Sequence, residues 1–188
     1  MNQELLKNNF VVINDFISKD RANNLYHQFK EIYKTHQNHF NDSIIAENSK
    51  GLYRPLIFME ILIEKIPFIA DFLEEPVFPT YAYGRFYKKN NSLLKHIDRP
   101  CCEISVTLNF NGDKEWPIWF TKPDDSAASV ILKPGQAAIY LGRNSLHWRD
   151  KYEGEEYTQV FLHYVKAKGE NRWAIFDIDK KQEQNYGY

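Results

Sequence analysis

Residues 104–141 read ISVTLNFNGDKEWPIWFTKPDDSAASVILKPGQAAIYL and carry the clearest signal of fold class. The apolar and β-branched runs in this stretch are 104–110, 117–120, 129–132 and 136–141. Between them lie turn-forming sequences rich in Gly, Pro, Asn and Asp. Strand patterns that follow one another without an intervening helix are typical of an antiparallel sandwich or barrel.

Further strand patterns flank this stretch, at 10–13, 77–87, 158–165 and 172–176. Helical patterns are confined to the N-terminal part of the chain. Ser18 is a candidate N-cap for a helix whose apolar residues recur with a period of about 3.6. A second apolar segment, 56–73, has helical spacing that Pro67 interrupts. The polar stretch 35–50 predicts a loop between the two helical segments. We therefore predict a mainly β fold with supporting N-terminal helices.

The length of 188 residues suits one domain. A chain of this size buries roughly 70% of its unfolded surface, which is enough for one core. We expect a single domain over 1–188, with an N-terminal strand and helices in 1–76, a β core in 77–178 and a loosely attached tail in 179–188.

The balance of charge excludes some partners. The chain has 24 Lys and Arg against 25 Asp and Glu, whereas binding to nucleic acid or to an anionic membrane ordinarily needs an excess of Lys and Arg. We therefore expect neither partner. Cys101 and Cys102 are adjacent and cannot staple distant segments. No apolar run approaches the roughly 18 residues of a membrane span. These features predict a cytoplasmic protein.

The sequence His96-Ile97-Asp98 carries the first candidate chemistry. In an extended segment, residues two apart point to the same face, so the imidazole and the carboxylate converge. His147 follows a predicted strand and offers a third ligand. Two His and one carboxylate are the ligand set of non-haem iron(II) oxygenases, which leaves coordination positions open. The H-x-D pair alone is a weak signal, because an ordinary polar loop can also contain it.

The order of these parts resembles the iron(II)- and 2-oxoglutarate-dependent oxygenases, specifically their prolyl-hydroxylase-like branch. The similar segments are FVVINDFIS at 10–18, RFYKKNNSLLKHIDRP at 85–100 and ILKPGQAAIYLGRNSLHWRD at 131–150. The resemblance implies a double-stranded β-helix, a cupin-like jelly roll, with the metal site at its open end. It also implies that His96, Asp98 and His147 bind iron(II).

One position departs from the family pattern. Such enzymes normally hold the far carboxylate of 2-oxoglutarate with an Arg or Lys a short way after the distal His, where this chain has Glu156, Tyr157 and Thr158. A glutamate there would repel the carboxylate. We predict that Arg149, two residues after His147, grips the carboxylate instead with two parallel hydrogen bonds. A salt bridge at the protein surface is the structural alternative for Arg149.

Two more residues are candidates for binding the cosubstrate. Tyr87 stands close to where the prolyl-hydroxylase-like enzymes place a tyrosine that meets the cosubstrate carboxylate. Gln159 shares one strand face with His163, and buried polar groups need partners; a bound ligand is one such partner, and a hydrogen-bonded core network is the commoner one for His163. One face of the strand at 77–87 carries Tyr81, Tyr83, Arg85 and Tyr87.

Aromatic residues make up 15% of the chain. Trp116, Trp119 and Trp148 fall in or beside the strands nearest the candidate ligands, so we expect some of the rings to face a pocket.

The resemblance implies a dioxygenase that hydroxylates an amino-acid, peptide or protein side chain and converts 2-oxoglutarate to succinate and carbon dioxide. Its cofactors would be iron(II) and 2-oxoglutarate, with ascorbate as a candidate reductant. Its partner would be a small-molecule, peptide or protein substrate, and the sequence sets no oligomeric state. Two alternatives stay open: a cupin-like module that binds a small polar ligand without redox chemistry, and a metal-dependent cupin enzyme that does not use 2-oxoglutarate.

Overall fold

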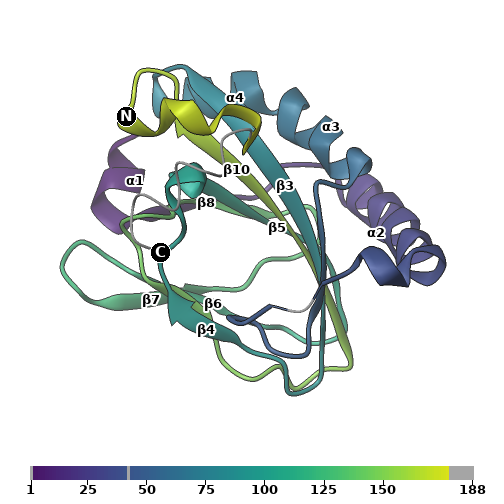
Figure 1. The fold of residues 1–188 in the computed structure, drawn as a ribbon. Coiled ribbons are helices and arrows are strands. Elements are labelled where there is room, and N and C mark those ends of the chain that lie inside the picture. The colour runs from purple at the N-terminus through teal and green to yellow at the C-terminus, as the bar shows by residue number, and fades with distance from the viewer. Residues whose placement is uncertain (1, 42, 178–188) are drawn as a thin grey trace.

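Two antiparallel β-sheets face each other, and helices cover the outer face of the larger sheet (Figure 1). The computed structural model describes residues 2–41 and 43–177. The helices are α1 (Gln3–Asn8), α2 (Lys19–Thr35), α3 (Leu56–Glu64) and α4 (Ile66–Leu73), with 3-10 turns η1 (Gln37–His39), η2 (Pro100–Cys102) and η3 (Glu170–Asp177). The strands are β1 (Phe10–Ile13), β2 (Lys50–Tyr53), β3 (Val77–Lys88), β4 (Leu93–His96), β5 (Ile104–Gly112), β6 (Ile118–Thr121), β7 (Ala127–Val130), β8 (Ala137–Leu141), β9 (His147–Arg149) and β10 (Glu156–Lys166).

The larger sheet has six strands in the order β1-β8-β5-β10-β3-β2, and the smaller has four in the order β4-β9-β6-β7. Every neighbouring pair is antiparallel. The predicted mainly β, double-stranded β-helix fold is therefore confirmed. The N-terminal part contributes more than support, because β1 and β2 form the two edges of the larger sheet.

The two faces of the larger sheet differ in chemistry because side chains alternate along each strand. On β5, Val106, Leu108 and Phe110 belong to the core that the helices cover. Their neighbours Ser105 and Thr107 are equally buried but belong to no hydrophobic cluster. The main hydrophobic core thus lies between the helices and the larger sheet. Between the two sheets lie a smaller hydrophobic cluster, built around Ile118, Phe120 and Tyr140, and the polar and aromatic groups of β3, β5 and β10.

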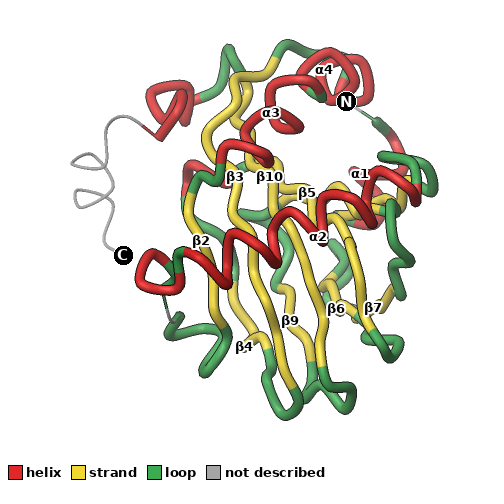
Figure 2. Tube along the Cα trace, turned by 90° about the vertical axis from the view of Figure 1, so that its right-hand side faces the viewer, coloured by secondary structure: helices red, strands yellow, loops and turns green. Residues whose placement is uncertain are grey.

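Helices α2 and α4 begin where the sequence indicates, whereas the short helix α1 was not predicted. Ser18 caps α2 by accepting a hydrogen bond from the backbone N–H of Arg21. Helix α4 starts at Ile66 with Pro67 in its first turn, where a proline is tolerated because its missing N–H would be unpaired anyway. Figure 2 shows α2 lying across the strands of the larger sheet, where Phe29 is fully buried among Phe58 and Phe86.

Some predicted elements are wrong or were missed. Residues 172–176 form part of η3 and not a strand. The prediction failed there because aromatic and branched residues pack equally well on a turn beside β3 and β10. Strands β4 and β9 were not predicted, since each is only a few residues long. The tail predicted at 179–188 lies outside the described residues.

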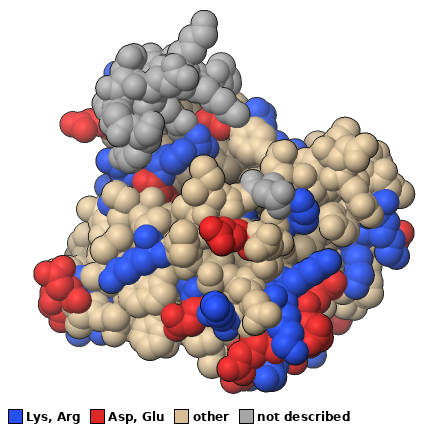
Figure 3. All heavy atoms as spheres, turned by 60° about the horizontal axis from the view of Figure 1, so that its bottom comes forward, with Lys and Arg blue, Asp and Glu red and all other residues tan. Residues whose placement is uncertain are grey.

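The surface shows two further features. On the face drawn in Figure 3, basic and acidic side chains are interspersed. Among the described residues, none of the helices has the length and apolar character that crossing a bilayer requires.

Candidate metal centre

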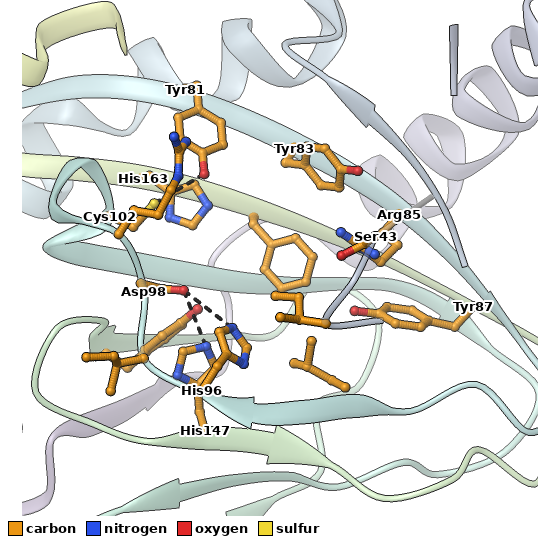
Figure 4. Close-up of a pocket in the computed structure, with 16 residues that line it drawn as sticks. Ser43, Tyr81, Tyr83, Arg85, Tyr87, His96, Asp98, Cys102, His147 and His163 are labelled. Carbon is orange, nitrogen blue, oxygen red and sulfur yellow. Dashed lines mark hydrogen bonds and ion pairs between the residues drawn. The ribbon is translucent and has the colours of Figure 1, made fainter. Parts of the chain in front are cut away.

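A cavity of about 430 Å³ lies between the two sheets. It falls in the size range of ordinary small-ligand sites, about 300–1,000 Å³. The larger sheet lines it with Tyr81, Tyr83, Arg85, Tyr87, Phe161 and His163. The smaller sheet and the loop after β4 contribute His96, Asp98 and His147 (Figure 4).

These last three residues form a compact triad. One potential ligand atom from each lies within 4.8 Å of the other two. Strands β4 and β9 pair His96 directly with His147, so backbone register brings the two imidazoles to one place. The Asp98 Oδ1 atom lies 3.7 Å from Nε2 of His96 and 3.5 Å from Nε2 of His147. The candidate ligands of the sequence analysis thus converge on one wall of the cavity.

Backbone carbonyls orient both imidazoles. The Nδ1 atom of His96 lies 2.7 Å from the Leu94 carbonyl oxygen, and that of His147 lies 3.0 Å from the Ser145 carbonyl oxygen. A carbonyl oxygen only accepts, so each Nδ1 carries a proton, and Nε2, which faces Asp98, is the ring atom available to a metal. This is the tautomer that a metal ligand needs, and the hydrogen bond to the other nitrogen fixes it.

Hydrogen bonds fix Asp98 at its backbone and at Oδ2, the carboxylate oxygen that does not face the imidazoles. Its Oδ2 accepts a hydrogen bond of 2.7 Å from Ser105, and its backbone N–H donates to Gly142. The Ser105 oxygen also lies 2.9 Å from Nδ1 of His163. Gly142 packs so closely that a Cβ there would collide with the Asp98 side chain and the carbonyl oxygen of Cys102. Only glycine fits at this position.

The triad carries a negative charge that favours binding of a cation, because Asp98 is ionised. Burial opposes ionisation of Asp98, but the neighbouring His147 and His96 outweigh it and hold the pKa of Asp98 well below its usual range. Burial likewise lowers the pKa of His147, yet the Asp98 charge more than offsets this and the net shift is upward. The carboxylate therefore attracts positive charge to the point where two nitrogen lone pairs converge. The donor set fits a divalent metal such as iron(II).

Tyr87, a predicted cosubstrate residue, lines the cavity. Its side chain is fully buried, and its hydroxyl has no hydrogen-bond partner among the described residues. Burial raises the pKa of Tyr87, so the hydroxyl stays protonated and able to donate. A buried hydroxyl that lacks a hydrogen-bond partner at a cavity wall is a group to which a bound ligand can supply an acceptor.

Arg149 and Gln159, the other two predicted cosubstrate residues, form a hydrogen bond with each other and do not face the cavity. Arg149 is buried, and its Nη2 donates to Oε1 of Gln159 at 2.7 Å, while its Nη1 donates to the Trp116 carbonyl oxygen. Gln159 in turn donates to Thr107. Neither Arg149 nor Gln159 is among the residues that line the cavity. The guanidinium predicted to meet a carboxylate instead lies between the rings of Trp116 and Tyr157.

Glu156 does not face the cavity either. Its Oε1 accepts hydrogen bonds from the Tyr26 hydroxyl at 2.5 Å and from Lys30 at 3.1 Å, both on α2. The expected repulsion between Glu156 and a cosubstrate carboxylate is therefore wrong, because the side chain points to the helix-covered face of the sheet.

The tryptophan rings also lie elsewhere. Trp119 and Trp148 stack on each other with ring centroids 5.8 Å apart, and Lys95 lies over Trp148. Neither they nor Trp116 line the cavity, whose aromatic wall consists of tyrosines, Phe161 and the histidines. Three of these rings, Tyr81, Tyr83 and Tyr87, come from β3, where alternation along the strand already indicated one shared face.

Ser105, which donates to Asp98, and Arg85, which lines the cavity, were not among the predicted site residues. Nothing local distinguishes Ser105, whose contact with Asp98 depends on how η2 packs against β5. Arg85 had a signal, since it is a cation on the same strand face as three tyrosines, but its face could not be assigned to a cavity without the sheet pairing.

Comparison with known proteins gives structural matches only. No protein-family model and no curated protein sequence matches the chain. A prolyl-4-hydroxylase from Pseudomonas putida superimposes with a TM-score of 0.71 at 12% identity, over 87% of this chain and 95% of that one. HygX from Streptomyces hygroscopicus, with nickel and 2-oxoglutarate bound, gives 0.72 at 9% identity, over 89% and 88%.

The fold is that of the 2-oxoglutarate-dependent oxygenases. A prolyl hydroxylase from Trichoplax adhaerens in complex with a hypoxia-inducible-factor peptide also matches, with a TM-score of 0.69 at 12% identity, over 98% of this chain and 90% of that one. HygX has in addition been solved with hygromycin B. At these identities the likeness extends to the fold alone, and the chemistry has to be argued from the residues of the cavity.

Proposed function

We propose that this protein is a non-haem iron(II)- and 2-oxoglutarate-dependent dioxygenase that hydroxylates an amino-acid, peptide or protein side chain. The observation that carries the proposal is the convergence of His96, Asp98 and His147 within 4.8 Å on the wall of a cavity in a double-stranded β-helix. A His-Asp-His triad at a cavity wall, with both imidazoles in the metal-binding tautomer, has no evident structural purpose.

The residues of the chain would divide the work as follows. Nε2 of His96, Nε2 of His147 and Oδ1 of Asp98 would hold iron(II) from one side and leave its other side open to the cavity. When bound, the iron and 2-oxoglutarate would supply the oxidising chemistry, with release of succinate and carbon dioxide and with ascorbate as a candidate reductant. Tyr87 would donate a hydrogen bond to the cosubstrate from its hydroxyl, which has no partner among the described residues. Ile45, Leu93 and Phe161 line the same cavity and would keep water out.

The cavity volume bears on the substrate. At about 430 Å³, the space is near the lower end of ligand-site volumes and must hold the cosubstrate as well as the group to be oxidised. This favours insertion of one side chain or a small molecule over enclosure of a large one. We place the reaction in the cytoplasm, whose reducing conditions suit two buried cysteines that are not joined in a disulfide, Cys101 and Cys102.

The test is to add iron(II) and 2-oxoglutarate to the purified protein without oxygen and record the visible charge-transfer band. We expect a band in the wild type and none in His147→Ala or Asp98→Ala. Succinate release on admission of oxygen, screened over amino acids and short peptides, then identifies the substrate class. Absence of metal uptake by the wild-type protein would refute the proposal.

A metal-dependent enzyme without 2-oxoglutarate is the second candidate. The observation in its favour concerns the start of β10, the position from which the 2-oxoglutarate-dependent oxygenases usually hold the cosubstrate with an Arg or Lys. In this chain the start of β10 places no Arg or Lys toward the cavity. A cupin-like module that binds a polar ligand without redox chemistry is the third. Metal uptake with turnover but without succinate would indicate the second candidate, and ligand binding that survives His96→Ala would indicate the third.

A further inference from the structure

Arg85 is a buried cation at the cavity wall. It lies on β3, directly opposite Gln159 of β10, and its side chain is one of those that line the cavity. The residue is 7% exposed. In Figure 4, Arg85 and Tyr87 stand on the opposite side of the cavity from His96, Asp98 and His147.

The guanidinium of Arg85 has few protein partners. Its Nη1 donates to the Ser49 hydroxyl at 2.7 Å, and its carbon lies 4.9 Å from the Tyr83 ring centroid and 5.8 Å from that of Tyr87. Among the described residues, no carboxylate forms an ion pair with Arg85 within 4.0 Å. An arginine cannot relieve this by losing its proton. Burying such a charge without an anion is costly.

The two buried arginines of this region therefore differ. Arg149 donates to two oxygen acceptors and is enclosed between two rings outside the cavity lining. Arg85 donates to one hydroxyl and faces open space, so an anion in the cavity would be its strongest partner.

Tyr87 gives the second, independent observation. It lies two residues after Arg85 on the same strand face, it is fully buried, and its hydroxyl has no partner among the described residues. A cation and a neutral donor side by side are the groups that recognise a carboxylate. A molecule with a metal-binding 2-oxo acid at one end and a carboxylate at the other would satisfy the triad and this pair together.

We propose that Arg85, assisted by Tyr87, binds the distal carboxylate of 2-oxoglutarate, in place of the basic residue missing from β10. The inference rests on the proposed function, because it takes the 2-oxo acid to bind at the triad. Arg85 and Gln159 are paired across the antiparallel strands β3 and β10. A cation on β3 at this position can therefore reach the same space between the sheets as a cation on β10.

The test compares two ligands on zinc(II)-loaded protein, which does not turn over. Calorimetry gives the affinities for 2-oxoglutarate and for 2-oxopentanoate, which has a methyl group in place of the distal carboxylate. We expect the wild type to prefer 2-oxoglutarate by about 10- to 100-fold. Arg85→Met should bring the ratio near unity by weakening only 2-oxoglutarate, and Tyr87→Phe should lower it by about 3- to 10-fold.

Three further variants keep the result interpretable. Arg172→Met removes one exposed positive charge and should leave the ratio unchanged. Arg85→Lys retains the charge and should keep part of the preference, which guards against a folding defect in Arg85→Met. Arg149→Met tests the competing anchor and should leave the ratio as in the wild type.

Each failure has its own meaning. If Arg85→Met binds zinc and keeps the preference for 2-oxoglutarate, the assignment is overturned. Loss of the preference in Arg149→Met alone would also overturn it. Failure of the wild type to bind zinc at all would instead refute the proposed function.

Discussion

The two oxygens of Asp98 have different partners, and this difference orients the triad. Oδ1 faces Nε2 of both His96 and His147, whereas Oδ2 is held by Ser105. Ser105 is fully buried and also contacts Nδ1 of His163 on the neighbouring strand. A carboxylate fixed in this way presents one oxygen to a metal without having to reorganise when the metal arrives.

Replacing Ser105 with alanine should weaken metal binding. The substitution removes the hydrogen bond to Oδ2 of Asp98 and the contact with Nδ1 of His163, so we expect cobalt(II) or zinc(II) affinity to fall by about 10- to 100-fold. A competition titration with a chelating dye measures this. Thr80→Val is the matched control, because it also removes a buried hydroxyl, but one bonded to the Cys101 carbonyl oxygen. Equal affinities in Ser105→Ala and the wild type would contradict the argument.

At the scale of elements, the side chain of Arg149 joins the two sheets through hydrogen bonds. Arg149 projects from β9 of the smaller sheet and donates to Gln159 on β10 of the larger sheet. Gln159 donates to Thr107 on β5, and Arg149 also reaches the Trp116 carbonyl oxygen. The network therefore spans three strands and the segment before β6, and every member is buried or nearly so.

Arg149→Met should destabilise the protein without removing a cavity group. The loss leaves the Trp116 carbonyl oxygen and Oε1 of Gln159 unpaired, so we expect the free energy of unfolding to fall by about 2–4 kcal/mol. Urea denaturation followed by circular dichroism gives the value. Arg172→Met, on the exposed surface, should change it by no more than about 0.5 kcal/mol. A change below about 1 kcal/mol for Arg149→Met would show that the network contributes little.

At the scale of the molecule, the main hydrophobic core and the candidate site are separated by the larger sheet. Helices α2 and α3 cover the outer face of that sheet, and the cavity lies on its inner face. Much of the stability can therefore come from helix packing on the outer face, while part of the space between the sheets stays open as the cavity. A metal at the triad would cross-link three segments that border the cavity, because its ligands come from β4, β9 and the loop before η2.

Metal should accordingly stabilise the whole chain. A ligand that binds only the folded state at about 100 times its dissociation constant adds about 2.7 kcal/mol. For a chain of this size that corresponds to a rise in Tm of about 5–10 °C. Differential scanning fluorimetry with nickel(II) or zinc(II) measures the rise, which His96→Ala and His147→Ala should abolish. An equal rise in these variants would place the metal elsewhere.

Local patterns in the sequence predicted much of this architecture. Period-two runs and turn residues identified most strands, and Ser18 and Pro67 marked where helices begin. Failures fell on short or ambiguous segments, such as β4, β9 and the turn η3, where tertiary contacts outweigh local preference. The H-x-D spacing and the later His147 nominated three residues that the structure brings within 4.8 Å.

The choice between Arg149 and Arg85 lay beyond the sequence. Both are arginines in extended segments, and alternation assigns each to a face of its own strand without saying what that face meets. Only the pairing of β3 with β10 and the packing of the two sheets turn Arg85 into the cavity and bury Arg149 against Gln159. The sequence by itself determined the strand pattern and the candidate triad, because these depend on local periodicity and spacing. The tertiary structure decided which charged side chains reach the cavity, because that depends on contacts between distant strands.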